Sequence, residues 1–271
     1  MVSKDIKDSK SGIAYYFSGT GNTSYVINSW VNYFKLNKIT LDKQKIEDIL
    51  TVTSQKDYEF FIIGFPVYAW YPPNFVIDFL EQLPNVEKKK VIIIATCGSQ
   101  VGSSLSVARK ILEKKNYDVI GTFTYILPSN ASFMFNKDVE SSEKIESKVK
   151  MATEKIKNDF DLMFSGQRKI IKKNIFLRLI HKFVHWGFSK QLKKAPWVVD
   201  KDKCTFCGTC QEICPTKNIT VKKMKREVKF SNNCVGCTRC YNFCPAKAIQ
   251  HKKINPNSKL KNRYTKMKEF V

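Results

Sequence analysis

The first 165 residues alternate short, fully apolar runs with longer amphipathic stretches. The apolar runs predict five strands, at residues 12–17, 38–41, 58–64, 91–96 and 118–127. Apolar positions spaced three and four apart predict helices between them, at residues 25–34, 74–83, 103–115 and 139–164. Continuous apolar runs are typical of strands buried on both faces, as in a parallel sheet. The alternation therefore predicts an α/β fold, a doubly wound five-stranded parallel sheet.

Ligands of such a sheet bind at the carboxyl ends of its strands, so the loops at residues 18–23, 65–71 and 96–102 are the candidate binding loops. The first reads S-G-T-G-N-T, between a predicted strand and a predicted helix. Its glycines permit a tight turn, and its amide and hydroxyl groups converge at a helix N-terminus, which predicts a phosphate cradle. It lacks the Gly-Lys-Ser/Thr of nucleoside-triphosphate loops. Taken alone, this short motif also fits a well-capped turn.

Eight of the nine cysteines lie between Cys204 and Cys244, in two similar segments. The chain reads C-T-F-C-G-T-C-Q-E-I-C-P from Cys204 and C-V-G-C-T-R-C-Y-N-F-C-P from Cys234. Each is C-x2-C-x2-C-x3-C-P, the spacing in which three cysteines hold one iron–sulfur cluster and the fourth holds the other. One [4Fe–4S] cluster is therefore expected on Cys204, Cys207, Cys210 and Cys244, and a second on Cys234, Cys237, Cys240 and Cys214.

Zinc and disulfides are the alternatives for these cysteines. A structural zinc site needs four ligands and has no use for a third interleaved cysteine in each half. Disulfides fit poorly with a sequence whose N-terminus lacks the apolar stretch of a secretory signal. The matching spacing favours iron–sulfur clusters, and a cytoplasmic location is expected.

Residues 198–252 resemble the bacterial two-cluster ferredoxins, a small α+β fold, and residues 10–165 resemble the flavodoxins, which bind FMN. The flavodoxin resemblance rests on S-G-T-G-N-T and on the segments G-F-P-V-Y-A-W and A-T-C-G-S-Q-V-G. It implies that FMN contacts Ser18, Gly19, Thr20, Gly21, Asn22, Thr23, Pro66, Val67, Tyr68, Ala69, Trp70, Thr96, Cys97, Gly98 and Gly102. Tyr68 and Trp70 also fit surface aromatics that seal a core, and Cys97 also fits a small buried apolar residue. The whole chain resembles the flavodoxin–ferredoxin fusion proteins of anaerobes.

Charge divides the chain in the same way. The net charge is +2 over residues 1–165, +9 over residues 166–198 and +12 over the remainder, in a total of +23. We therefore expect a flavodoxin-like domain at 1–165, a basic amphipathic connector at 166–198, a ferredoxin domain at 199–255 and a basic, solvated tail at 256–271. The apolar side of the connector is expected to pack one domain on the other. A peripheral membrane contact through residues 168–192 is the second interpretation.

His181 and His185 lie four residues apart on the connector, a spacing that can hold a metal ion, but no carboxylate accompanies them. A solvated or packed pair is the simpler expectation. No recognised nucleic-acid module accompanies the positive charge, so an acidic redox protein is the expected partner and nucleic acid is not.

The predicted function is electron transfer between two [4Fe–4S] clusters and FMN, and on to a redox partner. The alternative is a flavin-dependent reductase of a small substrate, fed by its own clusters, with Tyr68 and Trp70 lining the substrate pocket. A carrier needs no catalytic side chain, so whether the protein is an enzyme stays open. The candidate loops at residues 65–74, 96–104 and 128–137 contain no Asp or Glu, so the fully reduced, anionic flavin is expected to form more easily than in acidic flavodoxins.

Overall fold

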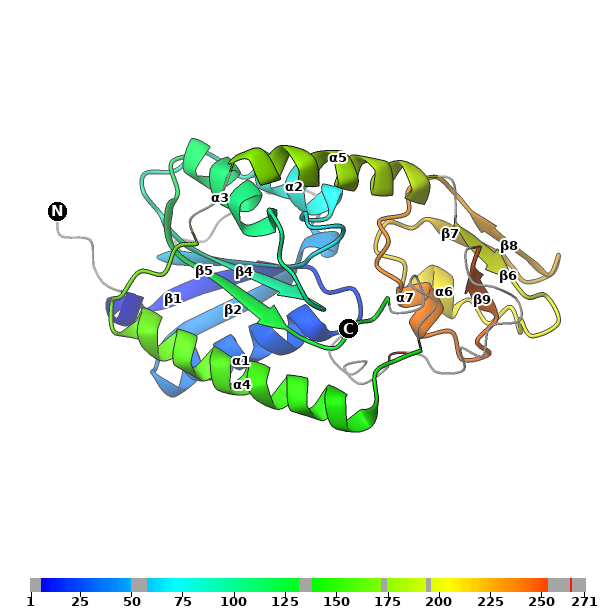
Figure 1. Ribbon diagram of the computed structural model, residues 1–271, viewed down its shortest axis with the longest axis horizontal. Helices are drawn as coiled ribbons and strands as arrows, with labels where there is room; N and C mark the ends of the chain where they lie inside the picture. Colours follow the sequence, from blue (N-terminus) through cyan, green and yellow to red (C-terminus); the bar gives the residue numbers. More distant parts are fainter. Residues whose placement is uncertain are drawn as a thin grey trace.

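The computed structural model describes residues 6–49, 58–131, 138–171, 175–193, 196–252 and Tyr264. Its larger domain contains a five-stranded sheet in the order β2-β1-β3-β4-β5, with all neighbours parallel (Figure 1). The strands are β1 (Ser11–Tyr16), β2 (Thr40–Lys45), β3 (Phe60–Pro66), β4 (Lys90–Cys97) and β5 (Asp118–Ile126). This order is that of the flavodoxin-like sheet, and the predicted fold class is confirmed.

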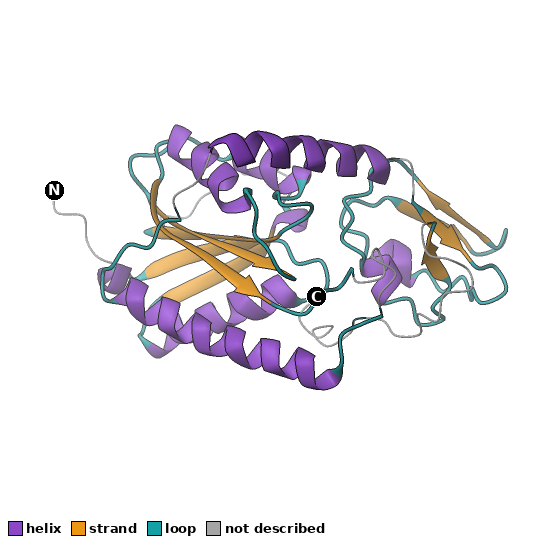
Figure 2. Ribbon diagram, in the orientation of Figure 1, coloured by secondary structure: helices purple, strands orange, loops and turns teal. Residues whose placement is uncertain are grey.

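Helices cover both faces of the sheet (Figure 2). α1 (Asn22–Leu36) and α4 (Ser142–Phe164) pack on one face, and α2 (Asn74–Gln82) and α3 (Ser104–Lys114) on the other. Of two short 3₁₀ turns, η1 (Ile6–Asp8) precedes β1 and η2 (Ile46–Asp48) follows β2 in the sequence. Alternate residues of each central strand point into opposite cores, so both faces of these strands must be apolar.

Several element boundaries differ from the predicted ones, and two of these differences have a clear physical reason. β2 runs from Thr40 to Lys45 instead of over residues 38–41, because this edge strand is largely exposed and its polar second half carries no apolar signal. α4 begins at Ser142 instead of residue 139, because the Ser141 hydroxyl accepts a hydrogen bond from the backbone N–H of Lys144 at 3.4 Å and caps the helix.

The smaller domain is built from two similar halves around two antiparallel hairpin-like pairs of strands (Figure 1). Its elements are β6 (Trp197–Val199), α6 (Thr209–Glu212), β7 (Ile219–Lys222), β8 (Glu227–Phe230), α7 (Arg239–Asn242) and β9 (Ile249–His251). β7 pairs with β8, and β6 pairs with β9. α7 lies on the side of this domain that faces the large sheet (Figure 1).

The connector forms α5 (Ile175–Leu192), which lies beside α2 and α3 and leads to the smaller domain (Figure 1). The expectation that its apolar side packs between the domains is wrong. Leu179, Ile180 and Phe183 are exposed. The opposite side packs instead, where His181 and His185 hydrogen-bond to the larger domain. None of the described helices combines the length and the apolarity that crossing a bilayer requires.

Most of the basic tail lies outside the described residues. Tyr264 is the exception and is 1% exposed, so the expected solvated arm is wrong at this position. Its hydroxyl donates to Asn22 Oδ1 at 2.5 Å, and its backbone N–H donates to Asn242 Oδ1 at 3.0 Å. This tyrosine therefore contacts both domains.

Replacement of Trp30 by alanine tests the aromatic core under α1 and α4. The Trp30 ring is fully buried among Phe34, Phe123 and Phe160. Trp30→Ala should lower the free energy of unfolding by about 3–5 kcal/mol, as other large aromatic deletions in cores do. Guanidinium chloride denaturation followed by far-UV circular dichroism measures this. Leu36→Ala, on the same helix but exposed, is the matched control and should stay within about 0.5 kcal/mol of the parent.

Candidate functional site

The loop at residues 18–23 joins β1 to α1, and its shape is fixed by its own first side chain. Ser18 Oγ accepts hydrogen bonds from the backbone N–H groups of Gly21 at 3.1 Å and Ser24 at 3.2 Å. Gly21 has φ of 99°, in the left-handed region that favours glycine. The Ser18 hydroxyl therefore organises the turn.

Other groups of the same loop remain open to a ligand. Within the described part of the chain, the backbone N–H groups of Gly19, Thr20, Asn22 and Thr23 donate to no protein atom. They surround the start of a fifteen-residue helix, where amide groups and the helix dipole favour an anion. Thr20 Oγ1 accepts from Asn130 Nδ2 at 2.6 Å. This arrangement suits a phosphate group.

A cavity of about 370 Å³ opens from this loop, within the size range of small-molecule sites. Of the fifteen residues proposed to bind FMN, the structure places thirteen in its wall: Ser18, Gly19, Thr20, Asn22, Thr23, Pro66, Val67, Tyr68, Ala69, Trp70, Thr96, Cys97 and Gly98. Gly21 and Gly102 do not line it. The remaining wall residues are Ser99, Gln100, Pro128, Ser129, Asn130, Ala131, Phe188 and Gly236. The first six lie in the candidate loops at residues 96–104 and 128–137, whereas Phe188 and Gly236 lie outside the candidate loops.

The aromatic loop after β3 is a tight turn held in an unusual conformation. Ala69 and Trp70 have φ of 49° and 61°, values that two-residue hairpin turns usually assign to Asn and Gly. Tyr68 and Tyr71 exchange backbone hydrogen bonds of 2.9 and 3.2 Å across the turn. A Cβ on Gly102 would lie 2.3 Å from Trp70 Cβ, so the loop after β4 approaches closely because it has glycine there. The strained turn places the Trp70 side chain at the cavity.

The two connector histidines hold this loop from outside. His181 Nδ1 lies 2.8 Å from Ser103 Oγ, and its ring stacks on Trp70 with centroids 5.4 Å apart. The ring of His185 stacks on Tyr71 at 5.0 Å, and its Nδ1 lies 3.0 Å from the Tyr68 carbonyl oxygen. Burial lowers the pKa of His185, so the neutral ring is favoured. The pair is packed, as the simpler expectation had it.

Cys97 ends β4 at the cavity wall and is buried. Burial raises the pKa of its thiol to about 11, and the nearby Lys148 only partly opposes this. A neutral thiol is a poor nucleophile, so Cys97 acts here as a small wall residue.

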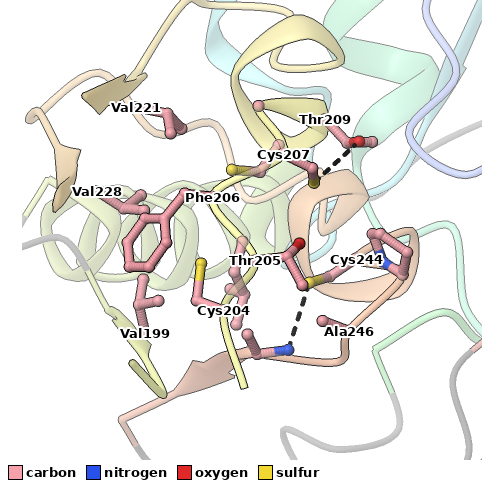
Figure 3. A pocket seen from close by; sticks show the side chains of 15 residues that line it. Val199, Cys204, Thr205, Phe206, Cys207, Thr209, Val221, Val228, Cys244 and Ala246 are labelled. Atoms are coloured by element: carbon pink, nitrogen blue, oxygen red, sulfur yellow. Dashed lines mark hydrogen bonds between the residues drawn. The ribbon is translucent and has the colours of Figure 1, made fainter. Parts of the chain in front are cut away.

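The other eight cysteines converge on two separate cavities of the smaller domain. Cys204, Cys207, Cys210 and Cys244 line the first, with an apolar surround that includes Phe206 (Figure 3). The backbone N–H of Ala248 donates to Cys244 Sγ at 3.3 Å, and Thr209 Oγ1 lies 3.3 Å from Cys207 Sγ (Figure 3).

The second cavity is lined by Cys214, Cys234, Cys237 and Cys240. Trp197 Nε1 donates to Cys234 Sγ at 3.4 Å, and the backbone N–H of Asn218 donates to Cys214 Sγ at 3.2 Å. In each half, the cysteine before the proline lines the cavity of the other half. This is the crossed pattern of cysteine ligands that the spacing predicts.

Each of the two cavities is lined by four thiols. Four thiolate ligands are the set that holds a [4Fe–4S] cluster. Burial raises the pKa of Cys237 to about 12, and the Arg239 charge opposes this shift. Thiolates at such buried positions need nearby positive charge, which iron would supply.

The two cofactor sites meet at one contact. A Cβ on Gly19 would lie 2.6 Å from Tyr68 Oη and 2.9 Å from the Cys237 carbonyl oxygen, so only glycine allows the domains to approach this closely. Gly236, the neighbour of Cys237, lines the cavity of the larger domain. Tyr68 Oη is buried and has no hydrogen-bond partner among the described residues, which leaves a donor at the junction. The second cysteine set is thus the proximal set, and the first is the distal set.

Comparison with known proteins agrees with this geometry. Residues 196–245 match a family model described as a 4Fe-4S dicluster domain. The C-terminal domain is therefore similar to 4Fe-4S dicluster domains, and the strand order of the larger domain is that of a flavodoxin-like sheet. Both findings agree with the expected flavodoxin–ferredoxin fusion and support an electron-transfer or redox role.

Solved structures similar to the fusion chain cover mainly its larger domain. The flavodoxin of Megasphaera elsdenii in its two-electron reduced form is 24% identical, with a TM-score of 0.39 over 42% of this chain and 84% of that one. Flavodoxin 2 of Bacillus cereus is 18% identical, with a TM-score of 0.40 over 58% and 99%. An NADH:FMN oxidoreductase in its apo form is 16% identical, with a TM-score of 0.40 over 63% and 94%. No curated protein matches the chain.

The absence of acidic side chains from the described wall of the FMN-sized cavity generates a prediction. Gln100 is an exposed wall residue, and Gln100→Glu would add a negative charge there. The added carboxylate should repel the anionic, fully reduced flavin. The reduction potential of the couple that forms this fully reduced flavin should therefore fall by roughly 40 mV, the equivalent of about 1 kcal/mol. Spectroelectrochemistry of the flavin absorbance measures the shift. Gln100→Ala should leave the potential unchanged, and an equal shift in both variants would contradict the charge argument.

Proposed function

We propose that the chain is an electron-transfer protein that passes electrons between two [4Fe–4S] clusters and an FMN, and on to a redox partner. The observation that carries this is the contact of Cys237 and Gly236 with the phosphate loop and the cavity of the larger domain. Clusters exchange single electrons, and a flavin accepts or gives one or two. The residues of the junction place the proximal cysteine set beside the phosphate loop and the wall of the larger domain's cavity.

The exposure of the cysteines supports an order along this route. Cys207 of the distal set is exposed, whereas Cys237 and Cys240 of the proximal set are buried. An external partner can therefore approach the distal set more closely than the proximal one. The proximal set is the intermediate site, between the surface and the FMN cavity.

The charges around the two sets differ in a way that supports flow toward the flavin. The proximal loop carries Arg239, whose guanidinium is buried next to Cys237. The corresponding residue of the distal loop is Thr209, which has no charge. A buried cation stabilises added negative charge, so an electron is favoured at the proximal set over the distal one.

The surface beside the distal set suits an acidic partner. The β7–β8 turn has four exposed basic side chains: Lys222, Lys223, Lys225 and Arg226. Lys223 approaches Gly208, within the distal cysteine loop, since a Cβ there would lie 3.8 Å from Lys223 Cε. Complementary charge raises the rate of encounter and orients the partner.

The reductase alternative has less support. Phe188 of α5 and Gly236 of the dicluster domain form part of the cavity wall, which leaves less of the wall to contact a small substrate. Tyr68 is buried with its hydroxyl toward Cys237 and does not present a catalytic acid to an open pocket. Its pKa is raised well above its ordinary value by burial.

Anaerobic flash reduction of the full holoprotein tests the electron route. After a one-electron pulse, the exchange between iron–sulfur and flavin absorbance should follow first-order kinetics, with a rate independent of protein concentration, because both sites lie in one chain. Cys207→Ala removes an exposed ligand of the distal set and should slow entry from an acidic donor at least tenfold. Met224→Ala, a 98% exposed position on the same turn, is the control and should leave the rate unchanged.

Three results would contradict the proposal. The first is anaerobic protein that contains no FMN, or fewer than two clusters by iron and sulfide analysis. The second is an exchange rate that rises in proportion to protein concentration. Saturable reduction of a small substrate, with no exchange between the sites, would support the reductase instead.

A further inference from the structure

A buried arginine of the dicluster domain holds the phosphate loop of the other domain. Arg239, at the start of α7, is 6% exposed. Its Nη2 donates to the Ser18 carbonyl oxygen at 2.7 Å and to Glu47 Oε1 at 2.5 Å, and its Nε donates to the Gly19 carbonyl oxygen at 3.1 Å. Its Nη1 donates to the Ile213 carbonyl oxygen within its own domain at 3.2 Å. One side chain thus fixes two consecutive peptide units of the loop.

These two hydrogen bonds determine where the loop amides point. In a trans peptide unit, the C=O and N–H groups point in opposite directions. The carbonyl groups of Ser18 and Gly19 point to Arg239, so the N–H groups of Gly19 and Thr20 point away from it. Gly19 and Thr20 line the FMN-sized cavity, and these two amides have no protein acceptor among the described residues.

The arginine is not a requirement of the cysteine loop itself. The corresponding position of the distal loop is Thr209, whose hydroxyl lies 3.3 Å from Cys207 Sγ. That half of the domain builds the same cysteine arrangement without a guanidinium. Apart from the Ile213 carbonyl oxygen, the hydrogen-bond acceptors of Arg239 belong to the larger domain. So does Phe17, whose ring centroid lies 5.3 Å from the guanidinium carbon.

We propose that Arg239 is a positioning residue for the phosphate group of the flavin, so that the dicluster domain completes the phosphate site of the other domain. It orients the Gly19 and Thr20 amides toward the phosphate and adds positive charge behind them. Glu47 accepts a hydrogen bond from the same Nη2 that binds the Ser18 carbonyl oxygen, and so orients the guanidinium. This inference rests on the proposed FMN site. It implies that cofactor affinity and domain docking are coupled.

Flavin titrations of the full anaerobic protein, with clusters intact and FMN removed, test this. Arg239→Met should raise the dissociation constant for FMN by about 10- to 100-fold, the effect of losing charge-assisted hydrogen bonds at a binding site. Riboflavin, which lacks the phosphate, should keep its dissociation constant within about twofold, because the ring contacts are unchanged. Arg239→Lys keeps the charge but cannot span both carbonyl groups, and should give an intermediate loss for FMN.

Two further variants keep the test decisive. Glu47 lies outside the cysteine motif, so Glu47→Gln should keep the clusters even if Arg239→Met loses iron. Glu47→Gln should also raise the dissociation constant for FMN. Arg109→Met removes a surface charge from α3 and should leave the dissociation constants for FMN and riboflavin unchanged. Unchanged FMN affinity in the Arg239 and Glu47 variants, or equal losses for FMN and riboflavin, would overturn the inference. A parent protein that binds neither flavin would instead overturn the proposed function.

A second observation concerns the outer side of α5. Six large apolar side chains of this helix are exposed, half of the twelve such side chains in the described chain: Leu177, Leu179, Ile180, Phe183, Val184 and Trp186. The opposite side is fixed to the body by His181 and His185, so the helix cannot turn its apolar face inward without losing those contacts. Clustered exposed apolar side chains mark interaction sites.

Positive charge flanks this apolar face. Residues 166–199 contain nine Lys and Arg and no Asp or Glu. A groove of about 510 Å³ along the helix is lined by Lys110, Lys114, Arg178 and Lys182, with Glu81 as the acidic residue of its described wall. Lys190 Nζ lies 5.0 Å from the centroid of the Trp186 ring, on the outer side of the helix.

The geometry points to an anionic lipid surface as the occupant of this face. An amphipathic helix with aromatic and aliphatic side chains on one side and Lys and Arg beside them binds in the headgroup region of acidic membranes. Trp186 and Lys190 combine the amphipathic ring and the cation that this region favours. The helix would lie along the surface and leave the distal cysteine set free for a partner.

Co-sedimentation of the holoprotein with vesicles tests this surface. Vesicles of phosphatidylcholine with 30% phosphatidylglycerol should bind the protein, whereas pure phosphatidylcholine vesicles should bind it at least tenfold more weakly. Phe183→Ser combined with Trp186→Ser should reduce binding to the acidic vesicles at least tenfold. Leu36→Ser, an exposed apolar position on α1, is the control.

Failure of the parent to bind acidic vesicles, or equal binding by the double variant, would overturn the inference. Sedimentation velocity provides the competing result. Self-association of the parent that the double variant lacks, without vesicle binding, would assign the face to a second copy of the chain. Binding of an acidic protein without lipid binding would assign it to a protein partner.

Discussion

The contact between Gly19 and the Cys237 backbone determines how the rest of the molecule can work. Any side chain at residue 19 would meet Tyr68 Oη and the Cys237 carbonyl oxygen at distances that real Cβ atoms do not tolerate. A glycine in the phosphate loop therefore has two roles, since the same residue that lets the loop turn also lets the second domain reach it. Arg239 then binds the loop carbonyl groups that this approach exposes. The interface is polar and specific, and it lies at the one place where both cofactor sites are within reach.

Much of the fold and part of this site follow from the sequence. The buried strands are continuous apolar runs, and the phosphate loop and the eight cysteines are short motifs whose spacing carries its own chemistry. The edge strand β2 was predicted too short because exposed strand residues such as Asp42 and Lys43 need not be apolar. The wall residues Pro128–Ala131 carry no motif, and only the sheet order brings them beside the loop after β1.

The interface was beyond sequence reasoning for a physical reason. Arg239 and Tyr264 contact residues more than 200 positions earlier, and Gly236 lines the same cavity as the phosphate loop. No periodicity or spacing encodes such a pairing. Arg239 did leave a signal, because it is a basic residue at the position where the other half of the repeat has the uncharged Thr209. The two halves differ at other positions too, so the signal alone does not name a partner. The prediction for the connector failed for a related reason. An apolar side of a helix predicts that this side is covered, but it does not tell whether another domain or an external surface covers it.

The hydrogen bonds of the junction also stabilise the docked arrangement of the two domains. A buried guanidinium without acceptors would be costly, and here all three guanidinium nitrogens have acceptors: two loop carbonyl groups, one carboxylate and one carbonyl group of its own domain. Separation of the domains would deprive the Glu47 carboxylate and the Ser18 and Gly19 carbonyl groups of this donor. The amides that a phosphate needs would then lose their fixed orientation. Asn242 and Tyr264 add a second polar contact beside the same loop, through Asn130 and Asn22. A docked state held in this way keeps the distance between the two cofactor sites constant, which is what electron exchange within one chain requires.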